Sequence, residues 1–210
     1  EGSLVDPLSC VIGAFNANYH LQEGSYNHTM GIRPQGRMLI LGGTGPMGLL
    51  AIDYALHGPV NPSLLVITDT DNDKLSYARK HYPSEPQTLI HYLNAADAAF
   101  DTLMALSGGH GFDDIVPNEG LVTLASSLLA TDGCLNFFAG PQDKHFSAPI
   151  NFYDVHYAFT HYVGTSGGNT DDMRAAVKLI EEKKVQAAKV VTHILGLNAA
   201  GETTLELPAV

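Results

Sequence analysis

The chain has 210 residues, of which 45% are hydrophobic and 16% are charged, and its formal net charge is −11 at pH 7. This length and composition predict one globular domain with at most a small appendage, and the negative charge argues against a nucleic-acid or anionic-membrane surface. Two cysteines are too few for a disulfide framework or a four-cysteine zinc site, which favours a reducing compartment. The sequence shows no signal peptide and no apolar stretch of membrane-spanning length, and we expect a cytoplasmic protein.

The first segment is predicted to be a helix, because its apolar residues recur at helical spacing. These residues are Val5, Leu8, Val11, Ile12, Phe15 and Tyr19. Asp6 and Pro7 are interpreted as the N-cap and the first helical residue. Residues 25–36 are polar and contain glycine, which is typical of a connection. We therefore expect an N-terminal helix and connection over 1–36, ahead of a domain over 37–210.

A glycine-rich turn follows the apolar run 38–41, which is predicted to be a buried parallel strand. The turn consists of Gly43, Thr44, Gly45, Pro46, Met47 and Gly48. In the dinucleotide-binding form of such a turn, Gly43 allows the tight bend, Gly45 leaves room for a pyrophosphate, and Gly48 lets the next helix pack closely. Pro46 suits the first helical turn, where its missing N–H group costs nothing. The start of this helix is predicted to face the phosphates.

An acidic residue completes this unit. The helix is predicted to stop at residues 57–59, and a second strand over 64–68 ends at Asp69. A carboxylate there accepts hydrogen bonds from the adenosine ribose; the alternative interpretation is that Asp69 simply ends a strand. The full context favours the ribose contact for Asp69 and a helix cap for Asp71. Both carboxylates repel a 2′-phosphate, so NAD is favoured over NADP; Lys74, the nearby cation, lines the adenine side or tolerates the phosphate.

Strands and helices continue to alternate, which predicts an α/β fold, a doubly wound parallel sheet of the Rossmann type. Further strands are predicted at 88–92, 112–116, 134–139, within 155–164 and at 190–194. Helices are predicted at 95–106, 121–130 and 173–184, followed by a weakly helical tail that ends at Pro208. Ligands in such folds lie beyond the carboxyl ends of the strands, near the point where the strand order reverses.

Several motifs resemble the medium-chain, zinc-type alcohol and polyol dehydrogenases. They are Asp-Pro-Leu-Ser-Cys at 6–10, Gly-Thr-Gly-Pro-Met-Gly-Leu-Leu at 43–50, Thr-Asp-x-x-x-x-Lys-Leu at 68–75 and Asp-Gly-Cys-Leu-Asn-Phe-Phe-Ala-Gly at 132–140. The segments 150–157, 163–169 and 191–197 look most like the sorbitol dehydrogenase and L-sorbose-1-phosphate reductase branch. The resemblance covers essentially the whole chain, and the proline after the second glycine makes it more specific than the general fingerprint.

The resemblance implies the cofactor-binding portion of a larger oxidoreductase, whose N-terminal segment is left from a missing catalytic domain. In the family that domain holds zinc through a Cys, a His and an acidic residue, so we expect zinc only in the full-length parent and assign no metal here. A family Glu-Pro places a carboxylate beside the zinc; Asp6 is one methylene shorter, and we prefer the N-cap interpretation. Family members are implied to be homo-oligomers through the edge strand near Tyr162.

The loops after three later strands supply the other candidate cofactor contacts. Residues 116–118 are expected near the ribose or nicotinamide, although Pro117 and Asn118 depart from the usual small-residue turn. Ala139, Gly140 and Thr165 are candidates to flank the nicotinamide, and an interpretation as simple turn residues is equally open. No catalytic residue is assigned.

The remaining reactive residues are interpreted as structural. The ten histidines form no convincing metal pair: His156 and His161 are expected in a strand region, and His193 is expected to pack near the domain junction. Cys10 and Cys134 are expected to be core residues. No tyrosine has a lysine four residues on, which excludes the short-chain dehydrogenase pattern.

The leading hypothesis is the NAD(H)-binding domain of a zinc-dependent oxidoreductase that interconverts a polyol or sugar-phosphate alcohol and its carbonyl form. Two alternatives remain open: a non-catalytic dinucleotide-binding module, and a relative of zinc-independent quinone reductases. The expected partners are the dinucleotide, a small polyol or sugar phosphate, and a second copy of the chain.

Overall fold

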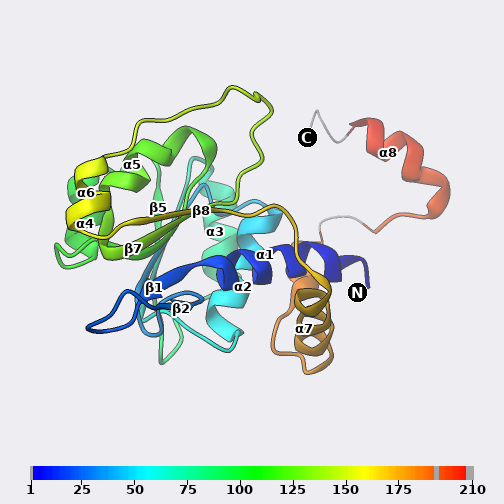
Figure 1. Ribbon diagram of the computed structural model, residues 1–210. Coiled ribbons are helices and arrows are strands. Elements are labelled where there is room, and N and C mark those ends of the chain that lie inside the picture. Colours follow the sequence, from blue (N-terminus) through cyan, green and yellow to red (C-terminus); the bar gives the residue numbers. More distant parts are fainter. Residues whose placement is uncertain (1, 192–193, 207–210) are drawn as a thin grey trace.

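The computed structural model describes residues 2–191 and 194–206. Six parallel strands form one sheet in the order β5-β4-β3-β6-β7-β8 (Figure 1). The strands are β3 (Arg37–Leu41), β4 (Leu64–Asp69), β5 (Leu89–Asn94), β6 (Phe112–Val116), β7 (Leu129–Phe137) and β8 (His161–Gly164). The order reverses between β3 and β6, which confirms the predicted doubly wound Rossmann-type sheet.

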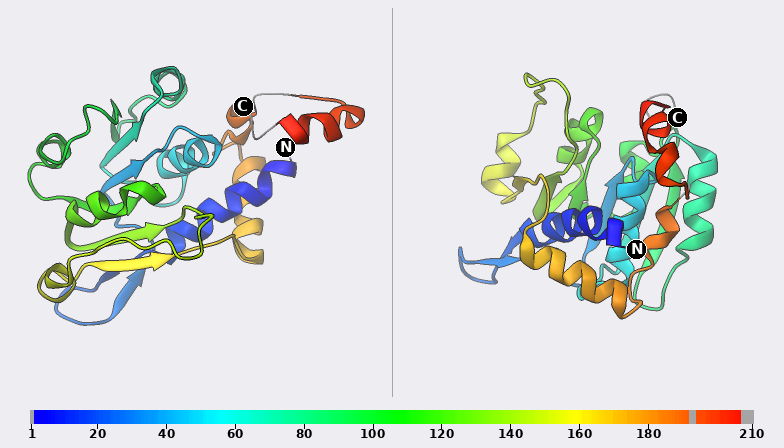
Figure 2. Two further views of the ribbon diagram at one scale, coloured as in Figure 1. Left: turned by 90° about the horizontal axis from the view of Figure 1, so that it is seen from above. Right: turned by 90° about the vertical axis from the view of Figure 1, so that its right-hand side faces the viewer.

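Helices cover both faces of the sheet (Figure 2). They are α1 (Val5–Ala17), α2 (Pro46–His57), α3 (Asn72–His81), α4 (Phe100–Leu106), α5 (Val122–Ser127), α6 (Phe152–Tyr157), α7 (Thr170–Glu181) and α8 (Ala200–Glu206). Short 3-10 turns are η1 (Gly2–Leu4), η2 (Glu119–Leu121), η3 (Ala187–Val190) and η4 (Leu197–Ala199). The side chains of β3 alternate, as strand geometry requires. Met38 and Ile40 pack with α1, α2 and α7, whereas Leu39 and Leu41 pack with α4 and α5.

The N-terminal segment differs from its prediction in two ways. Helix α1 begins at Val5 after the 3-10 turn, so Asp6 lies inside the first helical turn and the N-cap interpretation is wrong. Tyr19 continues the apolar spacing but lies in β1 (Tyr19–Leu21), which pairs antiparallel with β2 (His28–Met30). The predicted connection over 25–36 therefore contains a strand. The boundary between residues 36 and 37 stays a prediction.

The later elements correct further boundaries. Helices α4 and α5 are shorter than predicted, and β7 begins at Leu129, ahead of the predicted strand over 134–139. It contains a bulge, where Asp132 has a positive φ of 60°. His156 lies in α6 and not in a strand. The predicted strand over 190–194 is wrong where it is described: Val190 ends a 3-10 turn and Ile194 lies in no strand. His193 and Pro208 lie outside the described residues, and α8 is found away from the sheet (Figure 1).

Buried polar contacts hold the N-terminal segment against the sheet. Asp114 of β6 accepts hydrogen bonds from the Asn18 side chain at 2.6 Å and from the Arg33 backbone N–H at 2.8 Å. It also lies 3.1 Å from Nε2 of His20, whose Nδ1 is 2.8 Å from the carbonyl oxygen of Asp132. Burial lowers the pKa of His20, but the hydrogen bond and the charge of Asp114 outweigh it, so the pKa is raised. Both ring nitrogens face acceptors, which favours the imidazolium form.

We therefore predict that the chain loses stability as the pH rises from about 6.5 through the raised pKa of His20. A raised folded-state pKa contributes stability that is complete below the unfolded value of about 6.5 and is lost as the pH rises through the folded-state value. His20→Gln keeps a donor for Asp114 but cannot titrate, so the decline in unfolding free energy should become shallower. His57, whose pKa is raised by Asp53, contributes in the same direction and is removed separately by His57→Gln. Urea unfolding at a series of pH values measures both contributions; an unchanged slope in the His20 variant contradicts the prediction.

Candidate functional site

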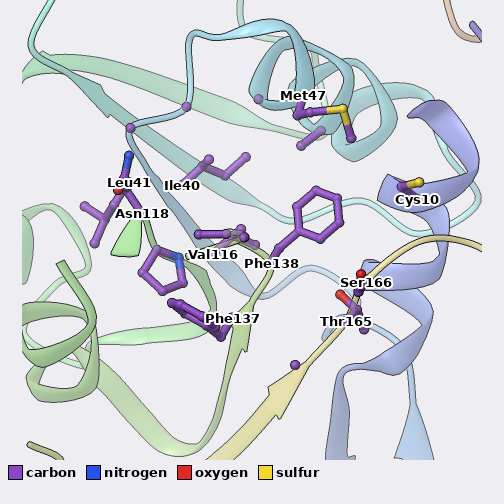
Figure 3. A pocket seen from close by; sticks show the side chains of 18 of the residues that line it. Cys10, Ile40, Leu41, Met47, Val116, Asn118, Phe137, Phe138, Thr165 and Ser166 are labelled. Atoms are coloured by element: carbon purple, nitrogen blue, oxygen red, sulfur yellow. The ribbon is translucent and has the colours of Figure 1, made fainter. Parts of the chain in front are cut away.

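A cleft of about 740 Å³ opens beyond the carboxyl ends of β3, β6, β7 and β8, where the strand order reverses (Figure 3). Seven of the residues predicted from the sequence line it: Gly43, Met47, Gly48, Asn118, Ala139, Gly140 and Thr165. The other predicted residues do not: Thr44, Gly45, Pro46, Asp69 and Lys74 lie at the turn and at the ends of β4 and α3. The predicted set is therefore split between the cleft and the neighbouring edge of the sheet.

The glycines of the turn have distinct steric environments. Gly42, one residue before the predicted glycines, is the left-handed residue of the turn, with a φ of 75°. A β-carbon on Gly43 would lie 2.6 Å from Cγ2 of Ile40. A β-carbon on Gly48 would lie 2.2 Å from the carbonyl oxygen of Gly43, so α2 meets the turn backbone to backbone. A β-carbon on Gly45 would meet nothing within 4 Å, which leaves open space at this position.

The amino end of α2 has the features of an anion site. Gly45 is the N-cap, Pro46 is the first helical residue, and no side chain caps the helix. The free N–H groups and the positive end of the helix dipole therefore remain available to a negatively charged group. The hydroxyl oxygen of Thr44 is buried and has no hydrogen-bond partner among the described residues. The turn thus offers both open space and unused donors.

Asp69 is fixed beside the turn by backbone groups. Its carboxylate accepts hydrogen bonds from the N–H of Thr44 at 3.0 Å and from the N–H of Asp71 at 3.2 Å. Burial raises the pKa of Asp69, but these bonds outweigh it, and the pKa lies below its usual value. Asp71 caps α3 as predicted, through the N–H groups of Asp73 and Lys74. The Lys74 ammonium lies 3.9 Å from the Asp71 carboxylate and is exposed.

Several cleft residues were not predicted. Two aromatic residues at the end of β7, Phe137 and Phe138, form one wall, and Figure 3 shows Phe138 between Met47 and Thr165. Their pattern in the sequence indicates only a strand end. Cys10 of α1 was expected in the core, yet it is half-buried and lines the cleft. Nothing local in the sequence indicates that α1 reaches this site. Cys134 is buried as expected, and burial raises the pKa of its thiol to about 12.

The described residues offer neither a metal centre nor a membrane span. No group of three His, Cys, Asp or Glu residues within 2–191 and 194–206 is arranged to hold a metal ion. The zinc that the family resemblance implies therefore has no fitting ligand set in the described part of the chain. No helix in that part is long and apolar enough to cross a membrane.

The fold and the site together define a dinucleotide-binding domain of the Rossmann type. The chain is 86% identical, over its whole length, to L-sorbose 1-phosphate reductase of Klebsiella pneumoniae, of which it covers 52%. It is 43% identical, over 98% of its length, to mannitol-1-phosphate 5-dehydrogenase of Aliivibrio fischeri, of which it covers 51%. The chain thus spans about half the length of these curated relatives. No family model matches.

Solved structures agree on the fold. An alcohol dehydrogenase of Escherichia coli CFT073, crystallised with NADH, superposes on this chain with a TM-score of 0.75 at 12% sequence identity. The superposition covers 98% of this chain and 54% of the alcohol dehydrogenase chain. At this identity the likeness shows the fold alone. The sequence relatives carry the closer likeness: the predicted resemblance to the L-sorbose-1-phosphate reductase branch is confirmed, over about half of each relative.

Proposed function

We propose that this chain binds NAD(H) and is the cofactor-binding part of an oxidoreductase that acts on a polyol or sugar phosphate. The observation that carries the proposal is the unit formed by β3, the glycine turn, α2, β4 and Asp69. In this unit α2 packs directly against the turn backbone at Gly48, whereas the space beside Gly45 is empty, as a bound pyrophosphate requires. The unused donors at the start of α2 and the buried Thr44 hydroxyl support the same assignment.

The proposed cofactor lies across the carboxyl edge of the sheet. Asp69 accepts hydrogen bonds from the adenosine ribose, Gly45 and Met47 flank the pyrophosphate, and Lys74 lies on the adenine side. The nicotinamide occupies the cleft between Asn118, Ala139, Gly140 and Thr165. When bound, the cofactor supplies hydride transfer at its nicotinamide ring, and the residues of this chain supply orientation and electrostatics.

The carboxylates favour NAD(H) over NADP(H). Asp69 stays ionised well below neutral pH, because hydrogen bonds lower its pKa, and Asp71 adds a second negative charge. A 2′-phosphate at the ribose would meet both, and Lys74 is already paired with Asp71. The cofactor with a free 2′-hydroxyl therefore fits better.

The substrate class comes from the relatives. One acts on L-sorbose 1-phosphate and the other on mannitol 1-phosphate, and both names describe carbinol–carbonyl redox chemistry on a phosphorylated sugar or polyol. We propose the same class for the protein to which this chain belongs, and we derive no zinc step because the described residues hold no zinc site. Self-association through β8, an edge strand of the sheet, stays a prediction.

Calorimetric titration of the 210-residue chain with NADH and NADPH tests the cofactor assignment. We expect both to release heat, with NADH at least tenfold tighter, because the loss of one charge-assisted hydrogen bond together with phosphate repulsion exceeds about 1.4 kcal/mol. ADP-ribose, which lacks the nicotinamide, serves as the control for the adenosine half. Tighter binding of NADPH would contradict the role of Asp69, and absence of binding by all three would remove the proposed function.

A further inference from the structure

A row of side-chain amides runs from the cleft to the centre of the sheet. The hydroxyl of Thr165, which lines the cleft just beyond β8, donates to Oδ1 of Asn136 at 3.1 Å. The amide nitrogen of Asn136 donates to Oδ1 of Asn18 at 2.9 Å, and the amide nitrogen of Asn18 donates to the Asp114 carboxylate at 2.6 Å. Asn136, Asn18 and Asp114 are 0%, 1% and 2% exposed, so water has almost no access to this row. We call these four residues the amide chain.

The direction of every hydrogen bond in the amide chain is fixed by acceptors at its inner end. A carboxylate can only accept, so Asn18 turns its NH2 group toward Asp114 and its oxygen toward Asn136. Asn136 must then donate to Asn18. Its second amide hydrogen is donated to the backbone carbonyl of Ala14 at 2.7 Å, which is also an obligate acceptor. The oxygen of Asn136 therefore faces Thr165, whose hydroxyl proton is committed to it.

The direction of these hydrogen bonds determines what the Thr165 hydroxyl can offer to a ligand in the cleft. A hydroxyl has one proton and two lone pairs, and the proton of Thr165 points into the protein. Only lone pairs remain for a ligand. We propose that Thr165 is an obligate hydrogen-bond acceptor in the cleft, that Asn136 is the positioning residue that makes it so, and that their ligand is the NH2 group of the nicotinamide carboxamide. The inference rests on the proposed function, because it places the nicotinamide end of the dinucleotide in this cleft.

The chemistry of the carboxamide matches this acceptor. Its NH2 group is a pure donor and its oxygen a pure acceptor, so a wall with a fixed acceptor orients the group. An oriented carboxamide fixes the rotation of the nicotinamide ring and therefore the face that it presents. Thr165, Ser166 and Phe138 all line the cleft, and Figure 3 shows the two hydroxyl residues beside the Phe138 ring; we expect a planar nicotinamide ring in this cleft to have the Thr165 hydroxyl at its edge.

The test compares NAD+ with its 3-acetylpyridine analogue, in which a methyl group replaces the NH2 group, and with ADP-ribose as the reference. We expect wild-type protein to bind NAD+ about fivefold more tightly than the analogue, which is the ratio for one ordinary hydrogen bond. Thr165→Val should bring this ratio close to one without changing the affinity for ADP-ribose. Thr165→Ser, which keeps the hydroxyl, should preserve the ratio.

Asn136→Leu tests the positioning role. It removes the acceptor for the Thr165 proton at nearly constant volume, and we expect the ratio to fall although Thr165 is intact. Thermal unfolding is followed in parallel, because Asn18 loses a buried partner. If Asn136 has only a structural role, Asn136→Leu will lower the melting temperature but leave the affinity ratio of NAD+ to its analogue unchanged.

The outcomes separate this inference from the proposed function. If ADP-ribose and NAD+ bind but the wild-type ratio is one, or if Thr165→Val retains the preference, the acceptor role is overturned and the dinucleotide site stands. If none of the three ligands binds the wild-type chain, the proposed function falls and this inference falls with it.

Discussion

Gly48→Ala is expected to be the most destabilising single-methyl substitution in the turn. Its β-carbon would lie 2.2 Å from the oxygen and 2.4 Å from the carbonyl carbon of Gly43. Both are backbone atoms, so the clash is relieved only if α2 moves away from β3. The two elements are packed together through buried residues, which opposes this movement. Overpacking of this kind costs about 3 kcal/mol, and more where the backbone cannot shift. Urea unfolding monitored by circular dichroism measures the loss.

Gly45→Ala is the matched control, because the same methyl group meets nothing within 4 Å. The backbone of Gly45, with φ −72° and ψ 173°, suits alanine, so stability should stay the same or rise by about 0.4–1 kcal/mol. The methyl group would occupy the space proposed for the pyrophosphate, and we expect the NADH affinity to fall at least about tenfold. Equal stability losses in the two variants, or unaltered NADH binding in Gly45→Ala, would contradict the assignment of roles.

Asp69→Asn is expected to weaken NADH binding by about 10- to 100-fold. The carboxylate is held in place by backbone N–H groups, and a hydrogen bond to a charged partner contributes about 1.5–3 kcal/mol. The affinity for NADPH should fall much less, because the substitution also removes the repulsion between the Asp69 carboxylate and the 2′-phosphate. The ratio of the two dissociation constants, measured by calorimetry, therefore moves toward one.

Asp71→Asn provides the control for charge alone. Asparagine caps helices about as well as aspartate, so α3 keeps its N-cap while one nearby charge is removed. We expect a change in NADH affinity of less than about threefold, since Asp71 makes no proposed ribose contact. The lowered pKa of Asp69 also sets the direction of the pH dependence of NADH binding. The affinity should persist in mild acid and decline only as the pH falls through that lowered pKa, where the carboxylate becomes protonated. Equal effects of both substitutions would contradict the ribose role.

Local sequence signals were sufficient for the half of the sheet that carries the glycine turn. The apolar run ending at Leu41, the proline at 46 and the acidic residue at 69 each act within a few residues, and the structure has β3, α2 and β4 as predicted. The hairpin of β1 and β2 gave no such signal, because it is held by Asp114 and Asp132, about one hundred residues away. The β-branched pair at 190–191 resembles a strand, but Val190 is the last residue of the 3-10 turn η3, which packs on α2, and Val191 caps that turn.

The candidate site divides in the same way. The turn residues were predictable because each glycine has a local steric reason. The wall of the cleft was only partly predictable, because Phe138 and Cys10 come together through the tertiary arrangement of β7 and α1. Thr165 was a candidate from its place after a predicted strand, but Asn18 and Asn136 had no sequence signal, and their hydrogen bonds to one another and to Thr165 exist only once the strands are paired.

The amide chain also changes what counts as a specificity residue in this fold. Whether the hydroxyl of Thr165 offers a proton or a lone pair is decided by two buried acceptors that it does not touch, the Ala14 carbonyl and, through Asn18, the Asp114 carboxylate. A survey restricted to ligand-contacting atoms would pass over Asn136, yet a substitution that removes its side-chain oxygen would free the proton of the Thr165 hydroxyl and change the chemical preference of the cleft wall. Redesign of the pocket, or divergence among its relatives, can therefore proceed through substitutions deep inside the molecule while the visible surface of the pocket stays the same.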